Sequence, residues 1–191
     1  MKFEINTKVF DQFTALESER LKYRQIIMQD SQRLFEIRSN FKVMKFMGRD
    51  EMKSISESED LIKSITESFL LGSGISWGII EKSTNILIGY FGFWRIDAYN
   101  CRGEIGYALH PNFWGNGYMK ETAYKLIEYG FKDIRLHSIE ANVHPNNLPS
   151  IKLLKKIGFR KEAYLRENFL FKNKFLDSVI YSLLERDLIK K

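Results

Sequence analysis

The residues best suited to chemistry in this chain form a short loop with two glycines, Trp114–Met119, which reads WGNGYM. A strand-like run precedes the loop, and a segment with helical spacing of apolar residues follows it. Two glycines near a strand end are often a plain turn. However, amides at the start of a helix point outward and the peptide dipoles add to them, which favours an anion. We therefore expect this loop to bind a pyrophosphate-bearing cofactor.

Two common nucleotide-binding patterns do not fit this loop. It lacks the Lys-Ser/Thr ending of a nucleoside-triphosphate loop, and it has no third glycine of a dinucleotide fingerprint. Those two kinds of nucleotide site are therefore disfavoured.

A second motif lies downstream and reads NNLPSIKLLKKIGF. Asn147 has the chemistry of a helix cap, and Pro149 is tolerated in the first helical turn. Ser150 then falls at the third helical position, and Gly158 suits the left-handed residue that ends a helix. The motif predicts a short helix that begins beside two polar side chains.

Apolar spacing predicts the strands that position these motifs. Ile75–Ile80 and Ile86–Arg95 flank the turn-forming Lys82–Asn85 and are typical of a hairpin. Further strands are expected at Leu21–Ile26, Glu104–Leu109 and Ile139–Val143, with a closing antiparallel hairpin of Asn168–Phe171 and Phe175–Leu184.

Three amphipathic helices are expected besides the one in the second motif. The first follows a cap at Asp30 and carries Leu34, Ile37 and Phe41 on one face. The second spans Glu57–Leu71, with Ser56 and Glu59 as a capping box. The third follows the glycine loop, and its apolar face comprises Ala123, Leu126, Ile127, Gly130 and Phe131. The order of elements predicts a mixed α/β sheet with helices on both faces.

Composition narrows the class of protein. A chain of 191 residues with 44% hydrophobic residues fits one domain, residues 1–191, since domains commonly run about 100 to 200 residues. One cysteine excludes an internal disulfide, and three scattered histidines show no metal-ligand spacing. The net charge of +6 is spread along the chain, which favours an ordinary solvated surface over a nucleic-acid face. No signal peptide or membrane span is recognisable, so we expect a cytoplasmic protein.

Four segments taken in order resemble the GCN5-related N-acetyltransferases (GNAT), and most closely the branch of the RimJ- and RimL-type ribosomal-protein N-terminal acetyltransferases. They read FTALESERLKYRQIIMQDSQRLFEIRSN, GEIGYALHPNFWGNGYMKETAYKLIEYGF, HSIEANVHPNNLPSIKLLKKIGF and SVIYSLLERDL. The resemblance is nearly as long as the chain.

This resemblance implies an acetyl-CoA enzyme whose twisted, mostly antiparallel sheet splays open between its fourth and fifth strands, here Glu104–Leu109 and Ile139–Val143. The pantetheine arm would lie in that gap, in contact with Asn147 and with backbone groups of the fourth strand. The strand contacts map onto Ala108, Leu109 and His110. The pyrophosphate contacts map onto the amides of Trp114, Gly115, Asn116, Gly117, Tyr118 and Met119, with Lys120 nearby.

The catalytic residues depart from the usual family pattern. Many relatives place a tyrosine four residues before the Gly-Phe pair to protonate the departing thiolate, and this chain has Leu154 there. By resemblance to RimL-like members, Ser150 replaces it, although a serine in a first helical turn also bonds its own backbone. Glu104 resembles the general base of some relatives, and Glu140 is the second candidate. A glutamate at a strand start is also commonly just solvated.

The acceptor amine is the open part of the prediction. A protein N-terminus, an aminoglycoside and a polyamine are alternatives, as is a module that binds CoA or nucleic acid without catalysis. Three segments are expected to border the acceptor entrance: Arg38–Asp50, Tyr99–Arg102 and Tyr164–Phe175. The protein is expected to be a monomer or a homodimer.

Overall fold

One eight-stranded sheet, in the order β1-β2-β3-β4-β5-β6-β8-β7, forms the centre of the protein. The computed structural model describes residues 3–189. Every neighbouring pair of strands is antiparallel except β5 and β6, which run parallel. The strands are β1 (Leu16–Glu17), β2 (Leu21–Gln25), β3 (Ile75–Glu81), β4 (Ile86–Asp97), β5 (Arg102–Leu109), β6 (Ser138–Val143), β7 (Arg160–Phe171) and β8 (Lys174–Leu184).

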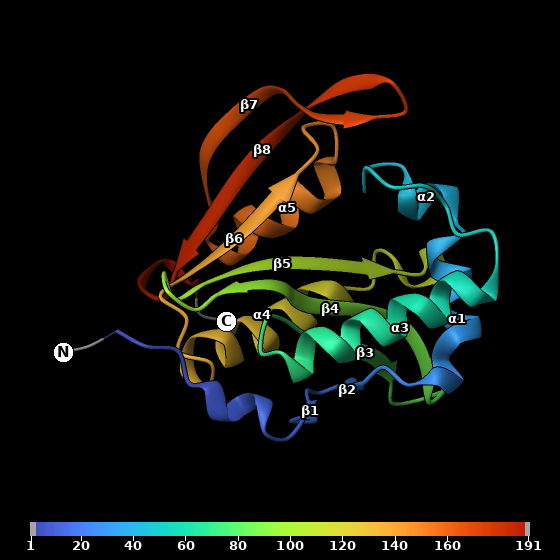
Figure 1. The fold of residues 1–191 in the computed structure, drawn as a ribbon, viewed down its shortest axis with the longest axis horizontal. Coiled ribbons are helices and arrows are strands. Elements are labelled where there is room, and N and C mark those ends of the chain that lie inside the picture. The colour runs from blue at the N-terminus through green and yellow to red at the C-terminus, as the bar shows by residue number, and fades with distance from the viewer. Residues whose placement is uncertain (1–2, 190–191) are drawn as a thin grey trace.

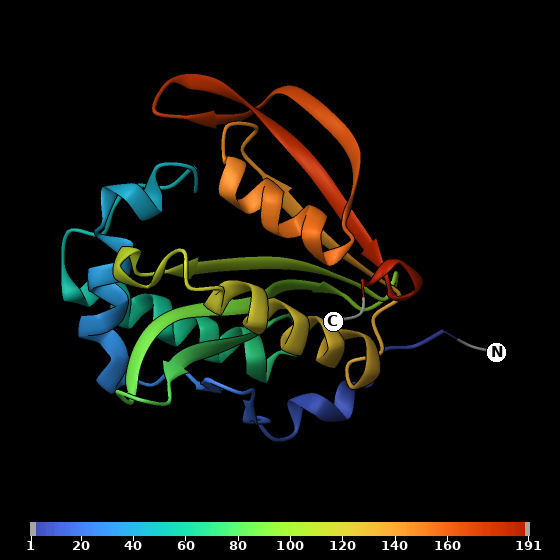
Figure 2. The same ribbon diagram turned by 180° about the vertical axis from the view of Figure 1, so that it is seen from behind.

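Helices cover both faces of this sheet, as predicted (Figures 1 and 2). On one side lie α1 (Ser31–Arg38), α2 (Phe41–Met44) and α3 (Ile55–Leu70), and on the other α4 (Tyr118–Lys132) and α5 (Leu148–Ile157). Short 3-10 turns are η1 (Thr7–Phe10), η2 (Met28–Asp30), η3 (Pro111–Phe113) and η4 (Glu185–Asp187). Within residues 3–189, no helix has both the length and the apolar character needed to cross a bilayer.

The sheet forks between β5 and β6. Their parallel pairing covers only the first residues of each strand and ends where Glu104 meets Glu140. Beyond that point β5 continues along β4, while β6 pairs with β8. The rest of β5 therefore has one free edge, and the predicted splay is confirmed for the same two segments.

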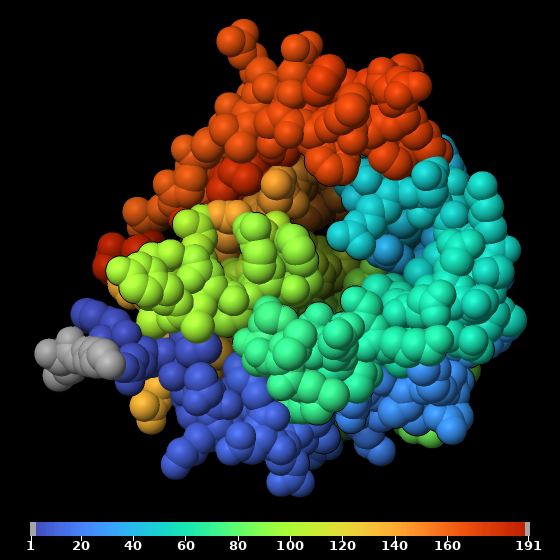
Figure 3. All heavy atoms as spheres, in the orientation of Figure 1, coloured from blue at the N-terminus to red at the C-terminus, as the bar shows by residue number. Residues whose placement is uncertain are grey.

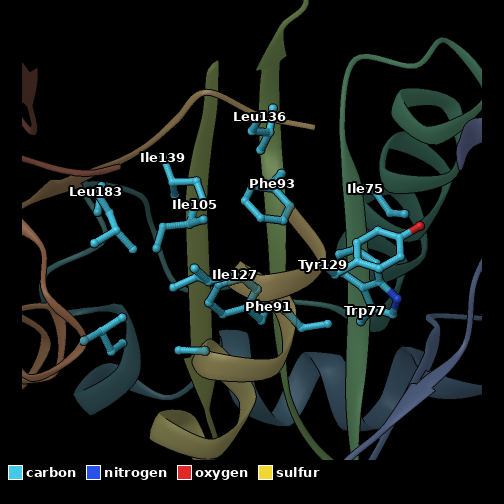
Figure 4. Packing of buried hydrophobic residues seen from close by; sticks show 14 of the residues in the cluster. Ile75, Trp77, Phe91, Phe93, Ile105, Ile127, Tyr129, Leu136, Ile139 and Leu183 are labelled. Carbon is cyan, nitrogen blue, oxygen red and sulfur yellow. The ribbon is translucent and has the colours of Figure 1, made fainter. Parts of the chain in front are cut away.

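The main buried cluster packs α4 against the middle of the sheet (Figure 4). Trp77, Phe91 and Phe93 project from β3 and β4 and are fully buried. Gly130 of α4 lies directly over Phe93, because a Cβ added at this glycine would come 2.5 Å from Cζ of that ring. The glycine thus permits the last turn of the helix to approach β4 closely.

Phe41 does not share a helix with Leu34 and Ile37, so that prediction is wrong. The first helix ends before it, and Asn40 caps α2 by accepting a hydrogen bond from the Lys42 amide at 3.0 Å. Phe41 is left 65% exposed. A polar residue that can cap a new helix interrupts the apolar spacing here.

Ser56 and Glu59 do not form the predicted capping box, because the long helix begins two residues earlier than predicted. Ser54 rather than Ser56 is the N-cap of α3. The carboxylate of Glu57, not that of Glu59, accepts a hydrogen bond from the backbone amide of Lys53 at 3.2 Å. Both Ser-x-x-Glu patterns occur in this stretch, and the helix begins at the earlier one, although the Ser54 side chain makes no cap hydrogen bond. The final hairpin is also longer than predicted, because β7 begins at Arg160, eight residues before the expected Asn168.

Candidate functional site

The loop between η3 and α4 presents a row of open backbone amides. Gly115 and Gly117 are left-handed, with φ of 81° and 77°, and Gly117 caps α4 without a side-chain hydrogen bond. Within residues 3–189, none of the amides from Gly115 to Lys120 donates to another group. A Cβ added at Gly115 would meet nothing within 4 Å. Unpartnered amides at a helix start form a site suited to an anion.

A buried carboxylate ties this loop to the N-terminal strands. Glu121, in the first turn of α4, accepts hydrogen bonds from Ser18 Oγ at 2.6 Å, from the Arg20 amide at 2.9 Å and from Arg20 Nε at 2.8 Å. Arg20 Nη1 also donates to the carbonyl of Asn116 at 2.9 Å. Burial opposes ionisation of Glu121, but these hydrogen bonds hold its pKa below the usual value. The carboxylate therefore stays charged and fixes the loop.

A hollow of about 360 Å³ opens beside the loop and is lined by Glu19, Arg20, Gly117, Lys120 and Glu121. Arg20 and Lys120 supply positive charge at its wall. The sequence reasoning missed Arg20 and Glu121, which lie 101 positions apart. A glutamate in a predicted first helical turn was the available signal, but nothing local identifies its partner.

The free edge of β5 offers backbone groups to a ligand. The His110 amide donates to the carbonyl of Ile88 at 2.8 Å, so it faces β4. Because backbone groups alternate in direction along a strand, those of Ala108 also face β4, and those of Tyr107 and Leu109 face the gap. Leu109 already accepts a hydrogen bond from Trp114 Nε1 at 2.8 Å through its carbonyl.

Ser150 lies across the gap from β5, at the start of α5. Its amide donates to Oδ1 of the predicted cap Asn147 at 3.3 Å, and Gly158 ends the helix with φ 116°. The Ser150 hydroxyl lies 2.6 Å from the hydroxyl of Tyr107 rather than on its own backbone. Leu154, where relatives have a tyrosine, is fully buried in the core. The hydroxyl pair thus joins the two sides of the fork.

The two candidate bases meet at the fork. Glu104 and Glu140 are partners in the last rung of the parallel pairing. Glu104 is 8% exposed and pairs with Arg95 Nη2 at 2.7 Å, and Glu140 pairs with Arg102. Burial raises the pKa of Glu104, and the charge of Arg95 opposes this shift.

Both glutamates point to the face that carries α1–α3. Residues four apart on a strand share a face, and Ala108 packs with Ile37 of α1 and Val43 of α2. Tyr107 points to the other face, against the cluster around α4. Among the described residues, no group of His, Cys, Asp or Glu side chains is arranged to hold a metal ion.

Contacts between distant segments enclose the α1–α3 side of the fork. The ring of Phe46 lies 5.2 Å from that of His144, and Phe169 of β7 packs on Gly48. Lys172 in the β7–β8 turn pairs with Asp50 at 2.7 Å. Figure 3 shows a hollow between the segment around residue 48 (cyan), the β7–β8 hairpin (orange) and the segment around residue 100 (lime). Two of the three segments expected at the entrance, Arg38–Asp50 and Tyr164–Phe175, therefore touch each other.

Comparison with known proteins identifies the family. The model described as "Acetyltransferase (GNAT) domain" matches residues 20–160. The "Uncharacterized N-acetyltransferase p20" of Bacillus licheniformis is 40% identical, over 91% of this chain and 97% of the relative. The "Putative ribosomal N-acetyltransferase YdaF" of Bacillus subtilis is 27% identical, over 92% and 97%. A crystal structure of a GNAT-family acetyltransferase from Bacillus anthracis shares 27% identity, with a TM-score of 0.81, over 91% of this chain and 99% of the other. The resemblance drawn from the sequence is thus confirmed, and the chain belongs to the GNAT family of acetyltransferases.

Proposed function

We propose that this protein transfers the acetyl group of acetyl-CoA to a primary amine by direct attack, without a covalent enzyme intermediate. One observation carries this proposal: the open amides at the start of α4 adjoin the free edge of β5. The amides of Gly115–Lys120 suit a pyrophosphate, and the β5 edge suits the amide groups of a pantetheine arm. Bound acetyl-CoA would supply a thioester carbonyl that an amine can attack.

The chain's backbone supplies the polarising groups in this proposal. We assign them to Tyr107 and Leu109, whose backbone groups face the gap, because the His110 amide is engaged by Ile88. An amide aimed at the carbonyl oxygen stabilises the charge that develops there during attack. Asn147 and Trp114 border the same gap and are assigned to hold the arm.

Glu104 is the proposed general base. An attacking amine must lose a proton, and a carboxylate with a raised pKa accepts one more readily near neutral pH. Glu140, its partner in the last rung, is the second candidate. Both lie on the α1–α3 face, so the amine is expected to approach from that side.

The charge on this side favours a protein N-terminus over a polyamine or aminoglycoside. Arg38 is 9% exposed and donates to Tyr90 Oη at 2.9 Å and to Met47 Sδ. Its Nε has no partner among the described residues. A buried positive charge repels a polycation. An α-amino group, with a pKa of about 7.7 to 8, is also partly neutral at pH 7.

The direct test is a turnover screen that measures free thiol from acetyl-CoA. Peptides with free N-termini, polyamines and aminoglycosides are compared at equal concentration. We expect turnover with peptides and little with the polycations. Preference for a polycation would overturn the acceptor assignment. Tight acetyl-CoA binding without turnover by any amine would indicate a non-catalytic CoA-binding module.

A binding test isolates the proposed pyrophosphate site. Asn116→Asp adds a negative charge within the loop, and Asn173→Asp adds the same charge at the exposed β7–β8 turn as a control. We expect the first to weaken CoA binding about tenfold, or about 1.4 kcal/mol, and the second to leave it unchanged. Equal affinity of both variants for CoA in titration calorimetry would refute the site.

A further inference from the structure

The proposed function assigns a role only to the backbone of Tyr107, but its side chain also contacts the site. It projects from β5 on the face opposite Glu104 and stacks on Phe91, with ring centroids 5.7 Å apart and planes 6° from parallel. Its hydroxyl reaches Ser150 Oγ at 2.6 Å. The stack fixes the ring, so the phenol is held against one particular hydroxyl across the fork.

The direction of this hydrogen bond follows from acidity. A phenol is a far stronger acid than an aliphatic alcohol, so Tyr107 donates and Ser150 Oγ accepts. The hydroxyl of Ser150 has no other partner among the described residues. Its own O–H is then left to donate elsewhere, and the helix start places it at the gap.

We infer that Tyr107 is a positioning residue that aims the Ser150 O–H at the departing sulfur and strengthens that hydrogen bond. This inference rests on the proposed function. When the C–S bond breaks, the electron pair stays on sulfur, Ser150 donates a hydrogen bond to it, and Tyr107 donates to Ser150. Donors in a chain polarise one another, so the phenol increases what the serine can stabilise.

The order of pKa values decides between hydrogen bonding and full proton transfer. Burial raises the pKa of Tyr107 to about 12, against the opposing effect of its hydrogen bond with Ser150. A thiol has a pKa of about 8.5, so transfer of the phenol proton to the thiolate would be uphill. The pair therefore stabilises the thiolate by hydrogen bonding, and sulfur takes its proton from water. The chain thus replaces the tyrosine lost at Leu154 with a serine supported by a tyrosine from the opposite strand.

The first test uses bound CoA alone and needs no acceptor. The ultraviolet absorption of the thiolate is titrated in the complex between pH 6 and 9.5, with desulfo-CoA as the blank. We expect the thiol of bound CoA to ionise at lower pH in the native protein than in Tyr107→Phe, which keeps the ring stack. Tyr129→Phe, a tyrosine buried against Trp77 in the core, should ionise CoA as the native protein does. Identical titrations of the native protein and Tyr107→Phe would overturn the inference.

The second test asks whether Tyr107 acts through Ser150. With any amine that the native protein accepts, Tyr107→Phe should lower kcat about tenfold, as expected for weakening one donor to developing charge, with an unchanged Kd for acetyl-CoA. In a Ser150→Ala background the same change should have no effect. An equal loss in both backgrounds would show that Tyr107 does not act through Ser150. Absence of turnover by the native protein would instead count against the proposed function, while the CoA titration would still judge this inference.

Discussion

At the scale of single residues, Glu104 shows how its surroundings suit a carboxylate to accept a proton. Burial beside the point where β5 and β6 separate raises the pKa of Glu104, and the charge of the neighbouring Arg95 opposes this rise. A base must be ionised to act, so activity should rise with pH through the Glu104 pKa, above the usual range of a glutamate. Removing the charge of Arg95 should shift this rise in activity to still higher pH.

Arg95→Gln is therefore expected to shift the acidic limb of the kcat/KM profile to higher pH. The glutamine can still hydrogen-bond to Glu104, but it carries no charge to favour the ionised form. The profile is measured from pH 5 to 9 with one accepted amine. Arg160→Gln, which breaks a surface pair with Asp187, serves as the control. An unmoved limb in Arg95→Gln, or a limb that persists in Glu104→Gln, would assign the base to another group.

At the scale of elements, α4 is held in place by contacts at both of its ends. Gly130 allows the close approach to β4, and Glu121 joins the first turn to the β1–β2 turn. The hydrogen bonds of Glu121 connect the helix to the edge of the sheet at β1 and β2, and they orient the open amides. The anion site is thus built by an element and its distant support together.

Glu121→Gln should lower the free energy of unfolding by about 1.5 to 3 kcal/mol, the usual worth of hydrogen bonds to a buried charge. It should also weaken CoA binding, because the loop loses its anchor. Glu128→Gln on the exposed side of α4 breaks only a surface pair with Lys132 and should cost less than about 1 kcal/mol. Urea unfolding and CoA titration measure both effects. Equal stability of the two variants would contradict the anchoring role.

At the scale of the whole molecule, the fork lies between β5 and β6, and other parts of the chain meet to enclose one side of it. The α2–α3 segment and the β7–β8 hairpin meet through Phe169 and Gly48, on the side from which the amine is proposed to enter. The cofactor loop lies at the start of α4, the helix on the other face of the sheet. Substitutions at the contact between the α2–α3 segment and the β7–β8 hairpin should therefore weaken binding of the acceptor amine and leave binding of acetyl-CoA unchanged.

Phe169→Ala is expected to raise KM for the amine about fivefold, equivalent to about 1 kcal/mol of lost apolar contact, with an unchanged Kd for acetyl-CoA. Phe175→Ala removes an equally large ring from the same hairpin, where it is 64% exposed, and should change neither constant. Steady-state kinetics and titration calorimetry check both variants. A matching rise in the acetyl-CoA Kd of Phe169→Ala would mean that the hairpin supports the donor site as well.

Acetyl-CoA should stabilise the whole domain. At about 100 times its Kd, a ligand that binds only the folded state adds about 2.7 kcal/mol. For a chain of this size that corresponds to a rise in Tm of roughly 5 to 10 °C. Asn116→Asp should show a smaller rise at the same concentration, and Asn173→Asp the full one. Scanning fluorimetry without any shift in the native protein would argue against donor binding.

The sequence by itself determined those features that depend on neighbours along the chain. The left-handed Gly115 and Gly117, the Asn147 cap and the left-handed Gly158 each follow from local backbone chemistry. The strands and most helices follow from apolar periodicity. Local signals fail where two of them compete, as at the start of α3.

Only the tertiary structure decided which distant residues meet. Tyr107 and Ser150 are 43 positions apart, and Arg20 and Glu121 are 101 apart. Which backbone groups of β5 face the gap depends on its register with β4, since a shift by one residue reverses every direction. Such contacts arise from packing of the whole sheet and its helices, and local preferences of the chain do not encode them.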